Sequence, residues 1–138
     1  MRLNFLVFVL AGLLWSLPAS AEDPRHSAIT DVIGAQLDAF RRDDAAAAFA
    51  FASPDIQAMF RSPENFLRMV AASYAPVHRP RATTFLDLVE RDGMPVQRVL
   101  FTGPDGDQVL ALYTMLRQAD GSWRIGGCVL VKATGEEA

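Results

Sequence analysis

The sequence contains few of the residues that build disulfides, metal sites and nucleophilic active sites. Its 138 residues include one cysteine, Cys128, and two histidines, His26 and His78. A lone cysteine cannot form an intramolecular disulfide, and these three side chains fall short of the ligand set of a structural zinc site. The sequence also has no nucleophile elbow, phosphate-binding loop or metal-binding triad. We therefore expect no resident metal and no cofactor.

Positive charge is also scarce. The chain has 13 Lys and Arg residues against 16 Asp and Glu residues, which gives a net charge of −3 at pH 7. Proteins that bind nucleic acids or anionic membranes present a basic surface to them. We therefore expect no nucleic-acid partner.

The longest apolar run is too short to cross a membrane. It extends from Phe5 to Trp15, about 11 residues, whereas a spanning helix needs roughly 20. Arg2 precedes the run, and Pro18 and a small-x-small site ending at Ala21 follow it. This layout is typical of a secretory signal peptide that is cleaved after Ala21. We expect a bacterial periplasmic or secreted protein without a membrane anchor; an uncleaved N-terminal anchor is the alternative.

Residues 22–132 are expected to form one domain, and its first half carries helix-start signals. Each signal is an N-capping side chain, in three of four cases followed by a proline at the first helical position. The four are Asp23-Pro24, Asp43 or Asp44, Ser53-Pro54 and Ser62-Pro63. Pro76 and Pro80 are expected to end the helical region, because the residue before a proline favours extended geometry.

From residue 83 onward the sequence predicts strands. Alternating apolar residues, separated by glycine-containing turns, indicate four strands at residues 83–90, 95–102, 109–117 and 123–132. Short turns between consecutive strands indicate an antiparallel meander. Residues 133–138 are expected to form a flexible acidic tail.

The expected fold class is therefore α+β. A four-stranded sheet with one apolar face needs a covering layer, and the N-terminal helices are the segments available for it. We expect three or four N-terminal helices packed on the concave side of a curved four-stranded antiparallel meander sheet.

Several motifs resemble those of known families. The strand that begins Trp123-Arg124-Ile125-Gly126-Gly127 resembles the W-x-I-x-G strand of the nuclear-transport-factor-2-like and cystatin-like α+β roll. Three further motifs resemble the bacterial family catalogued as domain of unknown function 4864, over nearly all of the mature chain: Gln36-x-x-Ala39-Phe40, Ala48-Phe49-x-Phe51-Ala52-Ser53-Pro54-x-Ile56-Gln57 and Tyr74-x-Pro76-Val77-x-Arg79-Pro80. The resemblance implies the roll fold and no particular activity, since that fold group hosts isomerases, dehydratases, ligand binders and assembly modules.

The densest polar cluster in the sequence is a candidate ligand-binding site. Tyr74, His78, Arg79 and Arg81 follow one another closely in a proline-rich stretch. Arginine suits bidentate contacts with carboxylate or phosphate, and histidine can transfer protons near neutral pH. The alternative is a solvated connector whose arginines pair with surface acids.

A candidate catalytic set combines Asp87 with His78 and Tyr113. If Asp87 points inward with Phe85, burial would raise the pKa of its carboxyl and suit it to act as a general base. If the Leu86 face points inward instead, Asp87 is exposed to solvent, and periodicity favours this second arrangement.

Two other features have simpler interpretations. Cys128 is expected to be a small core residue rather than a reactive thiol, because free cysteine is among the most buried residue types. Gly126 and Gly127 are expected to mark a close-packing point in a strand rather than a ligand loop.

Three functions remain open at this point. The first is an exported, non-enzymatic module that binds a small apolar or anionic ligand, or a protein partner. The second is an isomerase- or dehydratase-like enzyme that uses Asp87 and His78. The third is a homodimerising assembly module that pairs through an exposed sheet face.

Overall fold

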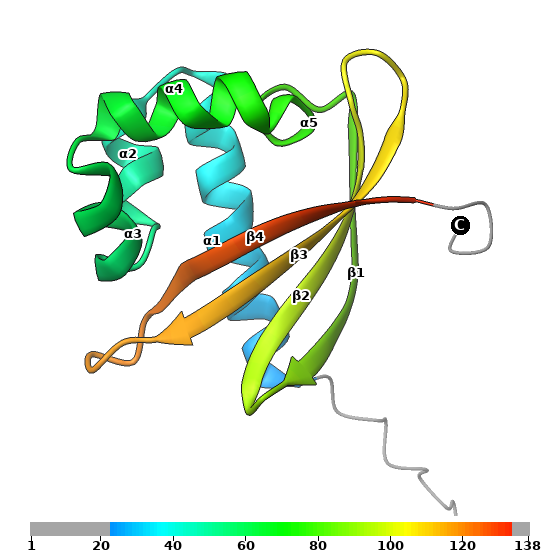
Figure 1. Ribbon diagram of the computed structural model, residues 1–138. Coiled ribbons are helices and arrows are strands. Elements are labelled where there is room, and N and C mark those ends of the chain that lie inside the picture. The colour runs from blue at the N-terminus through cyan, green and yellow to red at the C-terminus, as the bar shows by residue number, and fades with distance from the viewer. Residues whose placement is uncertain (1–22, 134–138) are drawn as a thin grey trace, which may run out of the picture.

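The computed structural model describes residues 23–133 as five helices followed by a four-stranded antiparallel sheet (Figure 1). The helices are α1 Pro24–Arg41, α2 Ala45–Ala50, α3 Pro54–Phe60, α4 Pro63–Ser73 and α5 Ala75–His78. The strands are β1 Ala82–Arg91, β2 Met94–Thr102, β3 Gln108–Arg117 and β4 Trp123–Lys132. This confirms the expected α+β class. The expected leader, residues 1–21, and residues 134–138 of the expected tail lie outside the described residues. No described helix has the length and apolar character needed to cross a membrane.

Local capping chemistry sets where the first four helices begin. In each case the N-cap side-chain oxygen accepts a hydrogen bond from a backbone N–H of the first turn, which satisfies a donor that has no partner within the helix. The caps are Asp23 for α1, Asp44 for α2, Ser53 for α3 and Ser62 for α4.

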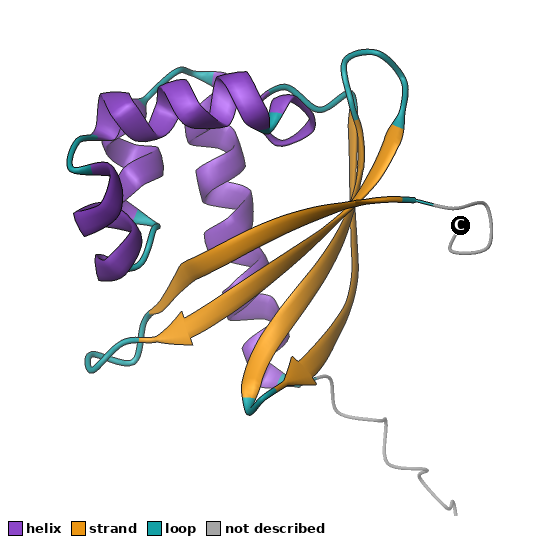
Figure 2. Cartoon of the chain, in the orientation of Figure 1, coloured by secondary structure: helices purple, strands orange, loops and turns teal. Residues whose placement is uncertain are grey.

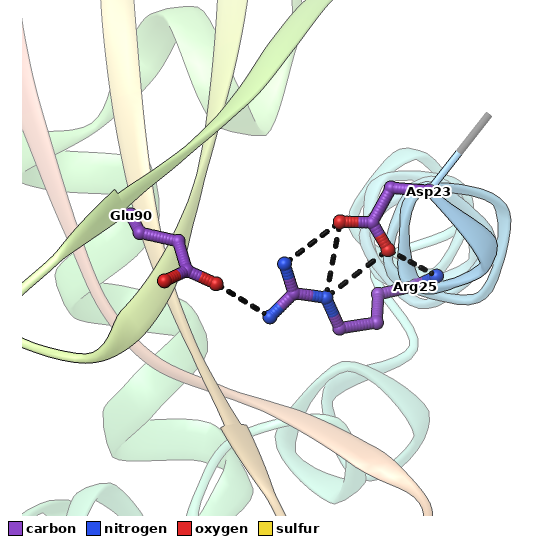
Figure 3. Close-up of polar contacts among 3 residues, drawn as sticks. All are labelled: Asp23, Arg25 and Glu90. Atoms are coloured by element: carbon purple, nitrogen blue, oxygen red, sulfur yellow. Dashed lines mark hydrogen bonds and ion pairs between the residues drawn. The ribbon is translucent and has the colours of Figure 1, made fainter. Parts of the chain in front are cut away.

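An ion-pair chain joins the start of α1 to the sheet. The Arg25 guanidinium contacts the Asp23 carboxylate at 2.7 Å and the Glu90 carboxylate, near the end of β1, at 2.8 Å (Figure 3). Exposed ion pairs of this kind add little to stability. This one links the first turn of the first helix to the first strand.

Helix α5 is a correction to the sequence prediction. Ala75–His78 forms a single helical turn, although Pro76 was expected to end the helical region. Proline is compatible with a first helical turn, because the N–H that it lacks would have no intrahelical partner there. The extended connector is therefore confined to residues 79–81.

The four strands follow the predicted meander, with order β1-β2-β3-β4 and antiparallel neighbours. The helices lie on one side of the sheet (Figure 2). The sheet residues in the hydrophobic core all point to that side: Val99, Phe101, Ala111, Tyr113, Met115 and Ile125. No helix of the described chain covers the opposite, outer face of the sheet, although Val96 and Leu110 on that face are buried.

A β-bulge breaks the alternation expected along β1. Phe85 pairs with Val99 and Leu88 pairs with Gln97, so Phe85 and Leu88 both lie on the helix-facing side. The side chain of the buried Gln97 donates to the carbonyl oxygen of Leu86, at 2.9 Å. This hydrogen bond satisfies a carbonyl group within the irregular segment, where the ladder is interrupted.

Candidate functional site

A largely apolar cavity of about 310 Å³ lies on the helix-facing side of the sheet. Helix α1 contributes Phe40, α3 contributes Met59, α4 contributes Met69, β3 contributes Tyr113 and β4 contributes Cys128. Ligand sites in proteins are typically concave, mostly apolar and of this size or larger. We therefore take the cavity as the candidate functional site.

Aromatic packing forms one wall of the cavity. The ring of Phe66 lies 6.0 Å from that of Phe40 and 5.6 Å from that of Phe60, measured between centroids, in tilted and edge-on arrangements. Such geometries are favourable for aromatic pairs. They fix α3 and α4 relative to α1 at the cavity.

The opposite wall is formed by the irregular part of β4. Gly126 is the extra residue there, since Thr114 pairs with Gly127 while Met115 pairs with Ile125. A Cβ atom on Gly126 would approach Leu116 to 2.6 Å. Gly126 is therefore a close-packing point, as predicted. The same prediction is wrong for Gly127, where a Cβ atom would meet no atom within 4 Å.

Three polar side chains line the cavity, and two of them have hydrogen-bond partners. Gln36 donates from Nε2 to the carbonyl oxygen of Ala48 at 3.1 Å. Tyr74 donates from Oη to the carbonyl oxygen of Cys128 at 3.2 Å. The buried hydroxyl of Tyr113 forms no hydrogen bond with correct geometry to any described residue.

Burial shifts the titration of the two groups at the cavity floor. It raises the pKa of Tyr113 well above its usual range, and the adjacent Cys128 thiol adds to this shift. Burial also raises the pKa of Cys128 to about 12. Both groups therefore stay protonated near neutral pH, so Tyr113 is a hydrogen-bond donor there and Cys128 is an unreactive thiol.

The predicted polar cluster is divided in the structure. His78 and Arg79 both contact Asp43, a residue of the α1–α2 turn, at 3.1 Å and 2.8 Å. Arg79 also donates to the carbonyl oxygen of Arg41. The hydrogen bond from His78, with the positive charges of Arg79 and His78, holds the pKa of the Asp43 carboxyl below its usual value. These contacts tie α5 to the end of α1.

The other two members of that cluster point elsewhere. Tyr74 lines the cavity, while the backbone N–H of Arg81 donates to Thr102 at 2.8 Å and its guanidinium lies near Gly106 in the β2–β3 loop. The four predicted binding residues therefore do not converge on one ligand site in the described structure.

Asp87 lies outside the core. Its side chain is 58% exposed and forms an ion pair with Arg98. The hydrogen bond from Arg98 is the main cause that lowers the pKa of the Asp87 carboxyl. The condition for a catalytic role, a buried carboxylate with a raised pKa, is not met. Within residues 23–133, Asp87 makes no hydrogen bond or ion pair with His78 or Tyr113.

Of the candidate site residues named in the sequence, Tyr74 and Tyr113 line the cavity, whereas its apolar wall residues were not identified as site residues. Met59 and Met69 occur at helical spacing, as core residues do, and the neighbouring sequence does not indicate that they line a cavity. Gln36 is an exception. It is a polar residue beside the apolar face of α1 defined by Ile33 and Phe40, and a polar side chain in such a position can indicate a cavity. No group of three or more metal-ligating side chains occurs in the part of the chain that the structure describes.

Comparison with models of protein families identifies the family of this chain. The model of the family described as "Domain of unknown function (DUF4864)" matches residues 22–138. No curated protein matches the chain.

Proposed function

The chain belongs to the DUF4864 family, whose description assigns no activity, and from the site alone we propose that it is a non-enzymatic module that binds a small apolar molecule in the cavity. The observation that carries the proposal is the cavity itself, with a largely apolar lining from α1, α3, α4, β3 and β4 and a buried hydroxyl that lacks a hydrogen-bond partner. Concave, mostly apolar pockets of this kind are typical binding sites for small molecules.

A fluorescence titration tests this proposal. The probe is 1-naphthylamine, an uncharged aromatic amine whose emission depends on its surroundings. We expect saturable enhancement with the wild-type protein. Met69→Trp places a larger side chain at the cavity and should abolish the enhancement. The control is Leu67→Trp, on the same helix and also half-buried, but not lining the cavity. Equal binding by both variants, or no saturable binding by wild type, would overturn the proposal.

The proposal includes export of the protein. It is supported by the leader-like layout of residues 1–21, with Arg2, an apolar run and a small-x-small site. Mass spectrometry of protein purified from its native source should give a chain that begins at Glu22. A chain that retains Met1 would contradict cleavage.

A second candidate function is homodimerisation through the outer face of the sheet. Val89, Val129 and Val131 are large exposed apolar residues on or beside this face, which no described helix covers. Asp87 and Arg98 lie there as an ion pair, so a second copy would meet a locally neutral surface rather than like charges. An exposed apolar patch of this kind is typical of an interaction surface.

A further inference from the structure

The chemistry of the cavity walls restricts the charge of any ligand. None of the described residues that line the cavity is an Asp, Glu, Lys, Arg or His. An ionised ligand would lose its hydration there without gaining a counter-ion, which is strongly unfavourable. The occupant that suits the cavity is therefore neutral.

The hydrogen-bonding state of the lining residues restricts the ligand further. The Gln36 amide donates to Ala48 and the Tyr74 hydroxyl donates to Cys128, so both of these groups already have partners. The Tyr113 hydroxyl has only the Cys128 thiol beside it, and sulfur is a weak acceptor. A buried donor without a good acceptor is unfavourable, and a ligand atom that accepts from it removes this cost.

We propose that the cavity binds a neutral, largely apolar molecule with one hydrogen-bond acceptor, such as a carbonyl oxygen, which accepts from Tyr113 Oη. The cavity volume of about 310 Å³ is at the lower end of the range for ligand pockets, which suits a small molecule. This inference rests on the proposed function, since it names the ligand class of the same cavity.

Access to the hydroxyl requires a small movement of the cavity lining. Tyr113 is only 1% exposed, so neighbouring side chains cover its hydroxyl. Met59 and Met69 belong to this lining, and methionine side chains are unbranched and change rotamer easily. A ligand can therefore reach the floor without movement of the sheet.

Three ligands of nearly the same shape test the inference. Acetophenone carries a carbonyl acceptor, isopropylbenzene replaces it with an apolar group, and benzoate replaces it with a charge. Binding of each is measured at pH 7 by calorimetry, to wild type and to Tyr113→Phe. We expect the ratio of acetophenone affinity to isopropylbenzene affinity to fall about five- to tenfold in the variant, as loss of one hydrogen bond predicts. Benzoate should bind neither protein.

The outcomes separate the two proposals. Isopropylbenzene binding equally well to both proteins is the internal control, since that ligand makes no use of the hydroxyl. If the affinity ratio is the same in wild type and Tyr113→Phe, or if benzoate binds as well as acetophenone, the ligand class is wrong while the cavity remains a binding site. If neither neutral ligand nor 1-naphthylamine binds to wild type, both proposals are wrong.

Discussion

At the scale of single residues, the hydroxyl of Tyr113 should contribute nothing favourable to folding. It is buried without a good acceptor, so folding removes its hydrogen bonds to water and does not replace them with a strong hydrogen bond in the protein. Tyr113→Phe should therefore leave the free energy of unfolding unchanged or raise it by up to about 1 kcal/mol. Chemical denaturation measures this difference.

The matched control is Tyr74→Phe. That substitution deletes the same atom, but the Tyr74 hydroxyl donates to the carbonyl oxygen of Cys128. Its loss should lower the free energy of unfolding by about 1 kcal/mol. A larger loss for Tyr113→Phe than for Tyr74→Phe would mean that the Tyr113 hydroxyl has an effective partner in the protein.

Cys128 should resist thiol reagents in the native state. Burial raises the pKa of its thiol to about 12, so at pH 8 the reactive thiolate is about one part in ten thousand. Labelling with iodoacetamide at pH 8 should be slow in native protein and fast in urea, where the thiol regains its ordinary pKa. Below the pKa of the native thiol, the thiolate fraction rises tenfold with each unit increase in pH. Native labelling should therefore accelerate between pH 8 and pH 11. Rapid native labelling at pH 8 would show that the thiol is accessible and ionised.

At the scale of elements, the bulge of β4 distinguishes two adjacent glycines. A Cβ atom at Gly126 would lie 2.6 Å from Leu116, whereas one at Gly127 would meet no atom within 4 Å. Gly126→Ala should therefore destabilise the protein by about 1–3 kcal/mol through overpacking. Gly127→Ala should be neutral, or stabilise by up to about 1 kcal/mol, because it restricts the unfolded chain. Thermal unfolding of the two variants checks this order, and equal costs would contradict it.

The elements themselves were largely predictable, because their boundaries depend on local chemistry. The caps Ser53 and Ser62, each followed by a proline, placed the starts of two helices correctly. The prediction that Pro76 ends the helical region was wrong, because the sequence alone does not distinguish a proline that ends one helix from a proline that begins the next. The bulge of β1 was not predicted: Gln97 of the neighbouring strand donates to the carbonyl oxygen of Leu86 within it, and the alternation of β1 alone does not show this contact.

The cavity could not be predicted for a related reason. Its lining residues, such as Phe40, Met69 and Tyr113, come from segments far apart in the sequence, and each is an ordinary core residue in its own element. A void depends on how well side chains from all of these segments fill the space between them. The periodicity of a single segment gives no information on how completely this space is filled.

At the scale of the whole molecule, the described helices cover one side of the sheet. The described helices pack on the face that carries Phe101 and Tyr113, and the outer face keeps exposed apolar side chains. Two sheets can bury such faces against each other at about 10 Å separation. If a second copy provides this cover, the dimer has a two-fold axis through the outer face, and each residue of that face meets the same surface of the partner.

Light scattering tests the dimer directly. The wild-type protein should have the mass of two chains. Val129→Lys places a charge on an outer-face side chain that is 58% exposed, so it should give a monomer without affecting the core. Met59→Lys is the control, because Met59 is 72% exposed but lies on α3, on the helical side. A wild-type mass of one chain would rule out the dimer. Equal dissociation by both variants would place the contact elsewhere, since only Val129 lies on the outer face.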